Sequence, residues 1–200
     1  MRVVRWFVVL LALSMFVFLF CSSLDGGDRA SGDDDTADDD SESCADQSNL
    51  GTDEGYTMED FTLYDENGDP LNLYDLCYKV VLIVSSVGWC PACAQEASNI
   101  VQDIWEPYKD EDFAIFYTIF EDSSGGVPDE AYLKSFKNLY DLPFHVYGDP
   151  QCVLCQYQDT YPRVYTPFNI VLSKEMEIYA EIAGYFVGTI KYYIETLLED

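Results

Sequence analysis

The sequence is poor in basic side chains. It has 10 Lys and Arg residues against 37 Asp and Glu residues in 200 positions, which gives a formal net charge of −27. A surface this acidic repels the phosphate backbone of nucleic acids and the headgroups of anionic lipids. Nucleic acid and acidic lipid surfaces are therefore excluded as expected partners.

Motifs of several other chemistries are also missing. The chain has no glycine-rich phosphate loop, no dinucleotide-binding fingerprint and no Ser/His/Asp set. Its single histidine, His145, stands at the start of a predicted strand, where a structural role is expected. Cysteine is abundant instead: seven residues in 200 point to redox chemistry, disulfide bonds or metal binding.

The N-terminus has the anatomy of an export signal. After a short basic stretch, residues 6–20 are apolar with one exception, and this run is shorter than the roughly 20 residues of a membrane span. We therefore predict a signal peptide over residues 1–20. Cys21 follows directly, which resembles a bacterial lipoprotein signal and implies a lipid anchor on Cys21. Cleavage near Ser23 and an uncleaved anchor are the alternatives. All three export the body to the periplasmic or cell-surface side, where disulfides form.

Residues 21–55 are expected to form an acidic, disordered tether. They contain twelve acidic residues and one basic residue, Arg29. Their apolar side chains are too few to offset the entropy lost on folding, and their like charges repel one another.

Residues 56–200 are predicted to form one α/β domain. The expected order is a hairpin over 56–76, strand 79–87, helix 94–108, strand 113–120, helix 129–140, strand 144–148, a cysteine-containing segment 150–165, strands 168–172 and 177–182, and helix 187–198. Strands that alternate with helices predict a sheet with helices on both faces.

The strongest chemical signal is the sequence Cys90-Pro91-Ala92-Cys93, between a buried strand and a helix. Two intervening residues place both sulfurs within one helical turn, and the helix N-terminus stabilises the thiolate of the first cysteine. Cys90 is therefore the expected attacking thiolate and Cys93 the resolving thiol, with reversible formation of a Cys90–Cys93 disulfide. A structural disulfide or half of a zinc site are the alternatives.

Residues 59–199 resemble the thioredoxin fold, specifically its exported TlpA/ResA-like branch, which is related to the AhpC/TSA proteins. The segments FTLYDENGDPLNL, KVVLIVSSVGWCPACAQE and TPFNIVLSKEMEI stand in the order of that branch. The resemblance implies a central mixed sheet flanked by helices with an N-terminal hairpin. It also implies a membrane-tethered thiol–disulfide oxidoreductase without an organic cofactor. Its partners would be protein or small-molecule thiols and disulfides and a membrane thiol redox partner, with apocytochromes or exported proteins among the substrates.

The same resemblance implies roles for further residues. Thr166-Pro167 matches the cis proline that packs against the dithiol in such proteins and docks the substrate strand. Glu96, three residues after the second cysteine, would move protons for the resolving thiol; a solvated helix face is the alternative reading. Trp89 and Pro91 would shape the rim of the site. Because proline is the first intervening residue here and usually the second in this branch, the direction of electron flow stays open.

A second CxxC, Cys152-Val-Leu-Cys155, is not required by the resemblance. Three roles are open for this pair. In order of preference they are a structural disulfide, a redox relay to Cys90 and Cys93, and a Cys₄ metal site formed with those two residues. If Cys21 is lipidated, six cysteines remain, and pairing 90–93, 152–155 and 44–77 would use them all; six cysteines allow 15 pairings, and the sequence alone does not choose among them. A bond between Cys44 and Cys77 would pin the tether to the domain. Two other functions follow from these options: a Zn- or Cu-binding thioredoxin-fold module, and a structural lipoprotein whose disulfides are inert.

Overall fold

A run of β-branched residues forms the centre of the sheet. In the computed structural model, which describes residues 44–199, all eight residues of β3 (Val80–Val87) are buried. β3 pairs in parallel with β4 (Phe113–Glu121) and antiparallel with β6 (Phe168–Leu172), so both of its edges are covered. A strand buried on both faces needs a continuous apolar sequence, and VVLIVSSV provides it except at its two serines.

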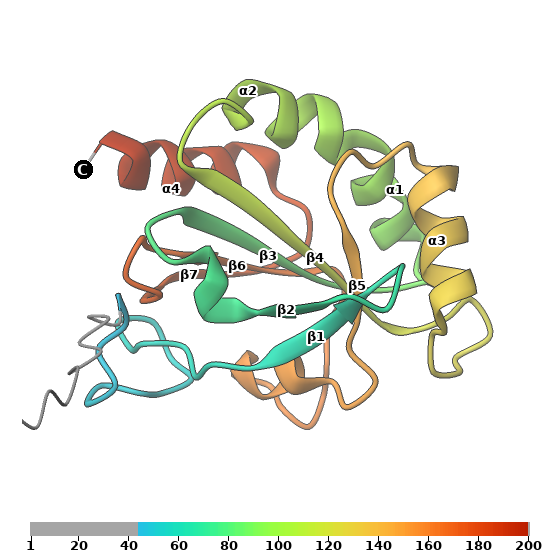
Figure 1. Ribbon diagram of the computed structural model, residues 1–200, viewed down its shortest axis with the longest axis horizontal. Helices are drawn as coiled ribbons and strands as arrows, with labels where there is room; N and C mark the ends of the chain where they lie inside the picture. Colours follow the sequence, from blue (N-terminus) through green and yellow to red (C-terminus); the bar gives the residue numbers. More distant parts are fainter. Residues whose placement is uncertain (1–43, 200) are drawn as a thin grey trace, which may run out of the picture. The chain divides into compact units, whose positions relative to one another are not determined.

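Four further strands complete a seven-stranded mixed sheet in the order β2-β1-β5-β4-β3-β6-β7 (Figure 1). β5 (Val146–Gly148) lies parallel to β4, and β7 (Ile178–Ala183) lies antiparallel to β6. The hairpin of β1 (Thr62–Asp65) and β2 (Pro70–Asn72) is added beside β5. The predicted mixed sheet and N-terminal hairpin are therefore confirmed.

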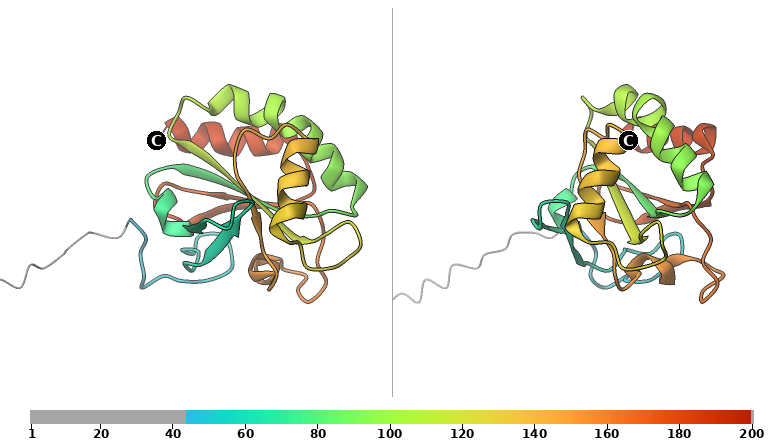
Figure 2. Two further views of the ribbon diagram at one scale, coloured as in Figure 1. Left: turned by 45° about the vertical axis from the view of Figure 1, so that its right-hand side comes forward. Right: turned by 90° about the vertical axis from the view of Figure 1, so that its right-hand side faces the viewer.

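The α-helices lie on one face of this sheet (Figures 1 and 2). They are α1 (Pro91–Ile100), which continues through the π-helical η2 (Val101–Trp105) into α2 (Glu106–Tyr108), then α3 (Glu130–Leu139) and α4 (Val187–Glu199). We expected helices on both faces, and for the α-helices this expectation is wrong. β3, β4 and β5 follow one another in one direction across the sheet, so two right-handed crossovers place α1 and α3 on the same side.

Short 3₁₀ helices and irregular chain cover the opposite face. There η1 (Leu73–Leu76) and η3 (Val153–Tyr157) pack with Met58 on Val81 and Ile83 of β3. The predicted signal peptide, Cys21 and the tether as far as residue 43 lie outside the described residues. Within residues 44–199, no helix is both long enough and apolar enough to span a bilayer.

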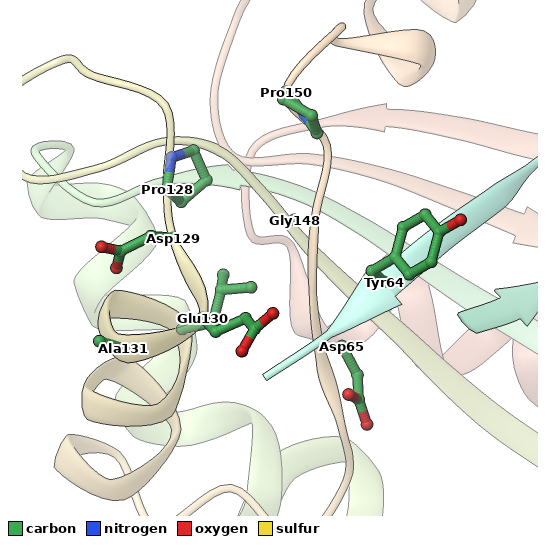
Figure 3. Close-up of a pocket in the computed structure, with 9 residues that line it drawn as sticks. Tyr64, Asp65, Pro128, Asp129, Glu130, Ala131, Gly148 and Pro150 are labelled. Atoms are coloured by element: carbon green, nitrogen blue, oxygen red, sulfur yellow. The ribbon is translucent and has the colours of Figure 1, made fainter. Parts of the chain in front are cut away.

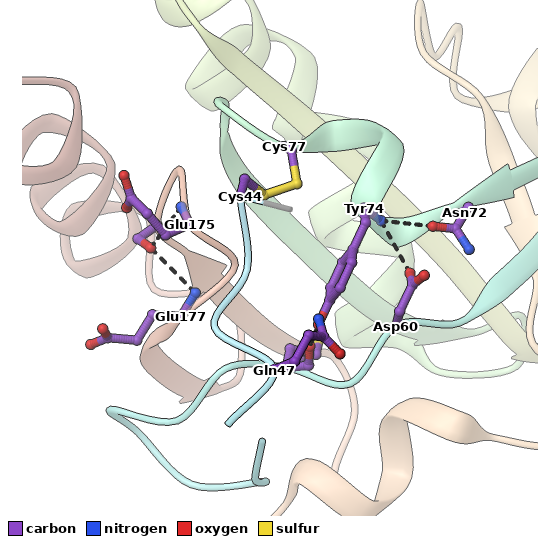
Figure 4. The surroundings of a disulfide bond; sticks show 10 residues. Cys44, Gln47, Asp60, Asn72, Tyr74, Cys77, Glu175 and Glu177 are labelled. Carbon is purple, nitrogen blue, oxygen red and sulfur yellow. Dashed lines mark hydrogen bonds between the residues drawn. A yellow bond between two sulfur atoms is a disulfide. The ribbon is translucent and has the colours of Figure 1, made fainter. Parts of the chain in front are cut away.

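Residues 44–55, which we assigned to the tether, pack against the domain (Figure 4). The structure contains a Cys44–Cys77 disulfide, next to which Tyr74 donates a hydrogen bond to the carbonyl oxygen of Met58 at 2.8 Å. Further along, the backbone N–H of Gly55 donates to Ile178 of β7 at 2.9 Å. This cross-link and the backbone hydrogen bonds offset the entropy of ordering a polar segment. The tether does not extend to residue 55.

A buried ion pair joins the β1–β2 turn to α3. Glu66 is only 5% exposed, and its Oε1 lies 2.6 Å from Nζ of Lys137 while its Oε2 accepts the Val146 backbone N–H at 3.0 Å. Burial acts to raise the pKa of Glu66, but the hydrogen bonds from Lys137 and Val146 outweigh it and lower the pKa from 4.5 to about 2. His145, whose Nδ1 lies 2.7 Å from Asp65, completes the cluster.

The depressed pKa predicts an acid-dependent stability. Because the folded pKa of Glu66 lies below its ordinary value of 4.5, the stabilisation is complete above that pH and is lost as the pH falls toward 2. We expect the free energy of unfolding of wild type to exceed that of Glu66→Gln by a margin that shrinks by about 2–3 kcal/mol over this range. Urea titrations between pH 2 and 7 measure it, with Glu177→Gln as an exposed carboxylate control. A margin that does not change with pH would contradict the ion pair's role.

Candidate active site

The two central cysteines lie where β3 passes into α1. Cys90 is the N-cap of α1, with Pro91 at the first helical position, where a missing N–H costs nothing. The Cys90 Sγ accepts the backbone N–H of Cys93 at 3.3 Å. Gly88 precedes them because a side chain there would collide with the hydroxyl of Tyr132 and the backbone nitrogen of Ser123.

The two thiols differ in exposure and in acidity. Both are free in this structure, which therefore holds the dithiol form; Cys90 is 8% exposed and Cys93 is completely buried. Burial opposes ionisation of Cys90, but hydrogen bonds from the Cys93 thiol and from backbone N–H groups of α1 outweigh it and lower the pKa of Cys90. Burial, together with the hydrogen bond donated to Cys90, raises the pKa of Cys93 to about 11. Cys90 is thus the thiol that ionises first.

The predicted proline loop faces Cys90. The Thr166–Pro167 peptide bond is cis, which confirms the prediction, and the Cys90 Sγ lies 3.6 Å from the Thr166 carbonyl oxygen. Pro167 is buried, and its own carbonyl accepts the backbone N–H of Gly184 at 2.8 Å, at the start of the β7–α4 loop. The start of α1 and the proline loop therefore meet at the Cys90 sulfur, and the β7–α4 loop is bonded to the same proline loop.

Exposed aromatic side chains stand on these same segments. Trp89 is 54% exposed, and its indole Nε1 donates to Oε2 of Glu121 at 2.7 Å. Tyr165 and Phe186, on the loops that flank Pro167 and Gly184, are also largely exposed. Sequence reasoning predicted Trp89 at the rim and missed Glu121, which comes from the end of β4 and pairs with Val87 across the sheet.

Glu96 lies in the interior, so a solvated helix face is excluded. It follows Cys93 by one turn on α1, and both side chains are completely buried. Burial and the nearby Cys90 raise the pKa of Glu96 to about 8, although a hydrogen bond from Asn169 opposes the rise. A carboxyl group that titrates near neutral pH suits proton exchange with a thiol.

Three further polar side chains near the thiols escaped the sequence reasoning. The Ser86 hydroxyl forms a hydrogen bond with the Cys93 sulfur. Its Oγ also accepts a hydrogen bond from the Tyr117 hydroxyl at 3.4 Å. The side-chain nitrogen of Asn169 lies 2.9 Å from Oε1 of Glu96. Their signal was a polar residue within an otherwise apolar strand, as in VVLIVSSV and FNIVL.

The second CxxC is arranged differently from the first. Cys152 and Cys155 form a disulfide at η3. The backbone N–H groups of Val153 and Leu154 donate to the buried carboxylate of Asp149, at 2.8 and 3.3 Å. At Cys90 the helix N–H groups point at a sulfur, whereas here they point at a carboxylate. The position that would stabilise a thiolate is therefore occupied by Asp149.

A Cys₄ metal site is contradicted by this arrangement. Two of its four sulfurs are bonded to each other, and a disulfide sulfur is not a thiolate ligand. Within residues 44–199, one group of three metal-ligating residues lies close together, namely Asp65, Glu66 and His145. Lys137 already binds Glu66 there, so a cation is present as a side chain.

Cavities lie beside these features rather than over the thiols. One, of about 500 Å³, opens between β1, the start of α3 and the β5–η3 connection, and its walls include Tyr64, Glu130 and Pro150 (Figure 3). A second, of about 220 Å³, adjoins the proline loop and is lined by Gln158, Tyr165, Phe168, Glu181 and their neighbours. Neither Cys90 nor Cys93 lines these two cavities.

Solved structures share this fold. A protein described as a thiol:disulfide interchange protein DsbE from Chlorobium tepidum aligns with a TM-score of 0.62 and 18% identity over 74% of this chain and 99% of its own. The thioredoxin domain of a thiol-disulfide oxidoreductase from Bacteroides vulgatus gives a TM-score of 0.56 and 19% identity over 72% and 99%. A secreted disulfide oxidoreductase of Mycobacterium tuberculosis gives 0.54 and 16% over 68% and 96%. The domain is thioredoxin-like.

The family follows from the sequence itself. Residues 55–180, more than half of the chain, match the AhpC/TSA family. The chain belongs to that family, as the resemblance implied. No curated protein matches this sequence.

Proposed function

We propose that this protein is an exported thiol–disulfide oxidoreductase that uses Cys90 and Cys93. The observation that carries the proposal is the division between the two thiols: a partly exposed Cys90 with a lowered pKa at the start of α1, and a buried Cys93 with a raised pKa. Cys90 is suited to attack a substrate disulfide, and Cys93 is suited to stay protonated until it resolves the mixed disulfide. The names of the structural neighbours, which are thiol–disulfide exchange proteins, support the same assignment.

In the reducing direction the reaction has two steps. The Cys90 thiolate attacks a substrate disulfide, a bond forms from Cys90 to one substrate sulfur, and the other leaves as a thiolate. Cys93 then gives its proton to Glu96 and attacks Cys90, which forms the Cys90–Cys93 disulfide and releases the second substrate thiolate. The substrate gains two electrons and the protein loses two. The oxidising direction is the reverse of the same steps.

Substrates would dock on the proline loop. An extended substrate strand laid along Thr166 would bring its sulfur to Cys90, since the Thr166 carbonyl oxygen lies 3.6 Å from the Cys90 Sγ. The exposed rings of Trp89, Tyr165 and Phe186 offer apolar contacts around that point. Protein thiols and disulfides are the proposed substrates. Export through residues 1–20, anchoring by a lipid on Cys21, and a membrane thiol redox partner belong to the same proposal.

A redox titration of the purified protein tests this function, with each cysteine read by alkylation and peptide mass spectrometry. We expect Cys90 and Cys93 to titrate together as a two-electron pair while Cys152–Cys155 stays oxidised, because Asp149 disfavours a thiolate there. Midpoints below about −200 mV mark a reductant and higher ones an oxidant.

A double variant, Cys152→Ser with Cys155→Ser, serves as the control and should leave the midpoint unchanged. If Cys90 and Cys93 do not titrate, the proposed function is wrong. If the double variant shifts their midpoint, the second pair takes part in the exchange.

A further inference from the structure

The buried acid of the site has a partner on another strand. Asn169 of β6 is completely buried, and its Nδ2 lies 2.9 Å from Oε1 of Glu96 and 3.2 Å from the carbonyl oxygen of Gly184. A backbone carbonyl only accepts, so the nitrogen of the Asn169 amide faces both groups. The amide therefore donates both of its N–H bonds, one to the acid and one to the β7–α4 loop.

This contact distinguishes the two oxygens of Glu96. Oε1 is held as an acceptor by Asn169, whereas the buried Oε2 has no hydrogen-bond partner among residues 44–199. In the protonated acid, the proton is therefore expected on Oε2. In the carboxylate, the Asn169 donor stabilises the negative charge, because a buried charge needs hydrogen bonds.

We propose that Asn169 is a positioning residue that orients Glu96 and sustains its ionised form while Cys93 gives up its proton. The inference rests on the proposed function, since it concerns the second step of that exchange. In that step the proton passes from the Cys93 sulfur to Glu96, and the Cys93 thiolate then bonds to Cys90. Asn169 takes no part in the exchange itself and acts through Glu96.

Other titratable groups face Glu96 as well. From α1 they are the thiols of Cys90 and Cys93, from β4 the Tyr117 hydroxyl, and from the β7–α4 loop the Tyr185 hydroxyl, which donates to Asp103 of η2 at 3.1 Å. Among residues 44–199, Asn169 is the hydrogen-bond donor to Glu96, so its loss leaves the carboxylate without one. The hydrogen bond from Asn169 lowers the pKa of Glu96, and its loss should raise it.

The test is the rate of the second step against pH. Reduced protein reacts with Ellman's reagent in two phases, in which Cys90 releases the first chromophore and Cys93 the second. For Asn169→Leu we expect the pH midpoint of the second phase to rise and its rate at pH 7 to fall roughly tenfold, with the first phase nearly unchanged. Thr118→Val is the matched control, since it removes a buried hydrogen bond to Val84 on the neighbouring strand.

A double-mutant cycle separates positioning from general damage. If Asn169 acts through Glu96, Asn169→Leu should add nothing to Glu96→Gln. Additive losses, or an Asn169→Leu profile that coincides with wild type, would overturn the inference.

Should Asn169→Leu fail to fold, Asn169→Asp keeps the volume and places a second carboxyl beside Glu96, which should also raise the midpoint; an unchanged midpoint would overturn the inference. A wild type without a first phase contradicts the proposed function instead.

Discussion

Cys93→Ser is expected to arrest exchange with the partner still attached. Cys90 keeps its place at the start of α1, with the backbone N–H of residue 93 at 3.3 Å and the Thr166 carbonyl beside it, so it still attacks a disulfide. Without the buried second sulfur, the mixed disulfide has no internal resolving thiol. Turnover should fall by at least about 10³-fold, as when a nucleophile is removed from other enzymes.

The measurement is covalent capture. Reduced Cys93→Ser is mixed with a disulfide-containing peptide, and in parallel with membrane and exported fractions of the host, and adducts are separated without reductant. We expect mass spectrometry to place each partner on Cys90. Cys90→Ser should capture nothing, and Cys155→Ser is the control for a thiol freed outside the site.

Two outcomes would count against the exchange mechanism. Capture through Cys93 in the Cys90→Ser variant would reverse the assigned roles, because the structure buries Cys93 completely. Failure of Cys93→Ser to react with the peptide disulfide would show that Cys90 is inert.

Glu96→Gln is expected to have the second largest effect, and the effect depends on pH. Because Glu96 has a pKa of about 8, the wild-type rate of the second step should rise as the pH passes through that value and the acid becomes a base. Glutamine cannot take the proton, so this rise should vanish and leave the later one set by Cys93, whose pKa is about 11. Loss of a general base lowers the rate by about 10²-fold or more near pH 8.

The two-phase assay described for Asn169 measures this directly. The first phase, which belongs to Cys90, should be changed little by Glu96→Gln, and any small change should be an increase. A neutral residue removes the negative charge that lies near Cys90 and so favours its thiolate. A second phase with an unchanged pH midpoint would mean that Glu96 takes no part in the proton transfer. Glu175→Gln, an exposed carboxylate outside the site, is the matched control.

Local pattern was sufficient for much of the fold. The apolar run of β3, the alternation of the β1–β2 hairpin and the placement of Cys90 at the start of α1 all follow from short-range chemistry: side-chain period, turn residues and the helix N-terminus. The burial of β3 could be predicted for the same reason. The direction in which the crossovers run across the sheet could not be predicted from local pattern. The expectation of helices on both faces was wrong for that reason.

The amino-acid sequence by itself determined that this chain carries a dithiol between a buried strand and a helix, with a proline loop and an acid at matching positions. Only the tertiary structure decided which polar groups meet. Glu96 and Asn169 are 73 residues apart. The pKa of a buried acid is set by its neighbours, so a role in proton transfer can be assigned only once those neighbours are identified. The two CxxC motifs are alike in spacing and differ in what their helix N–H groups point at: a sulfur at Cys90, the Asp149 carboxylate at Cys152. Hydrogen-bond partners and burial are set by contacts between distant segments, and spacing along the chain does not contain them.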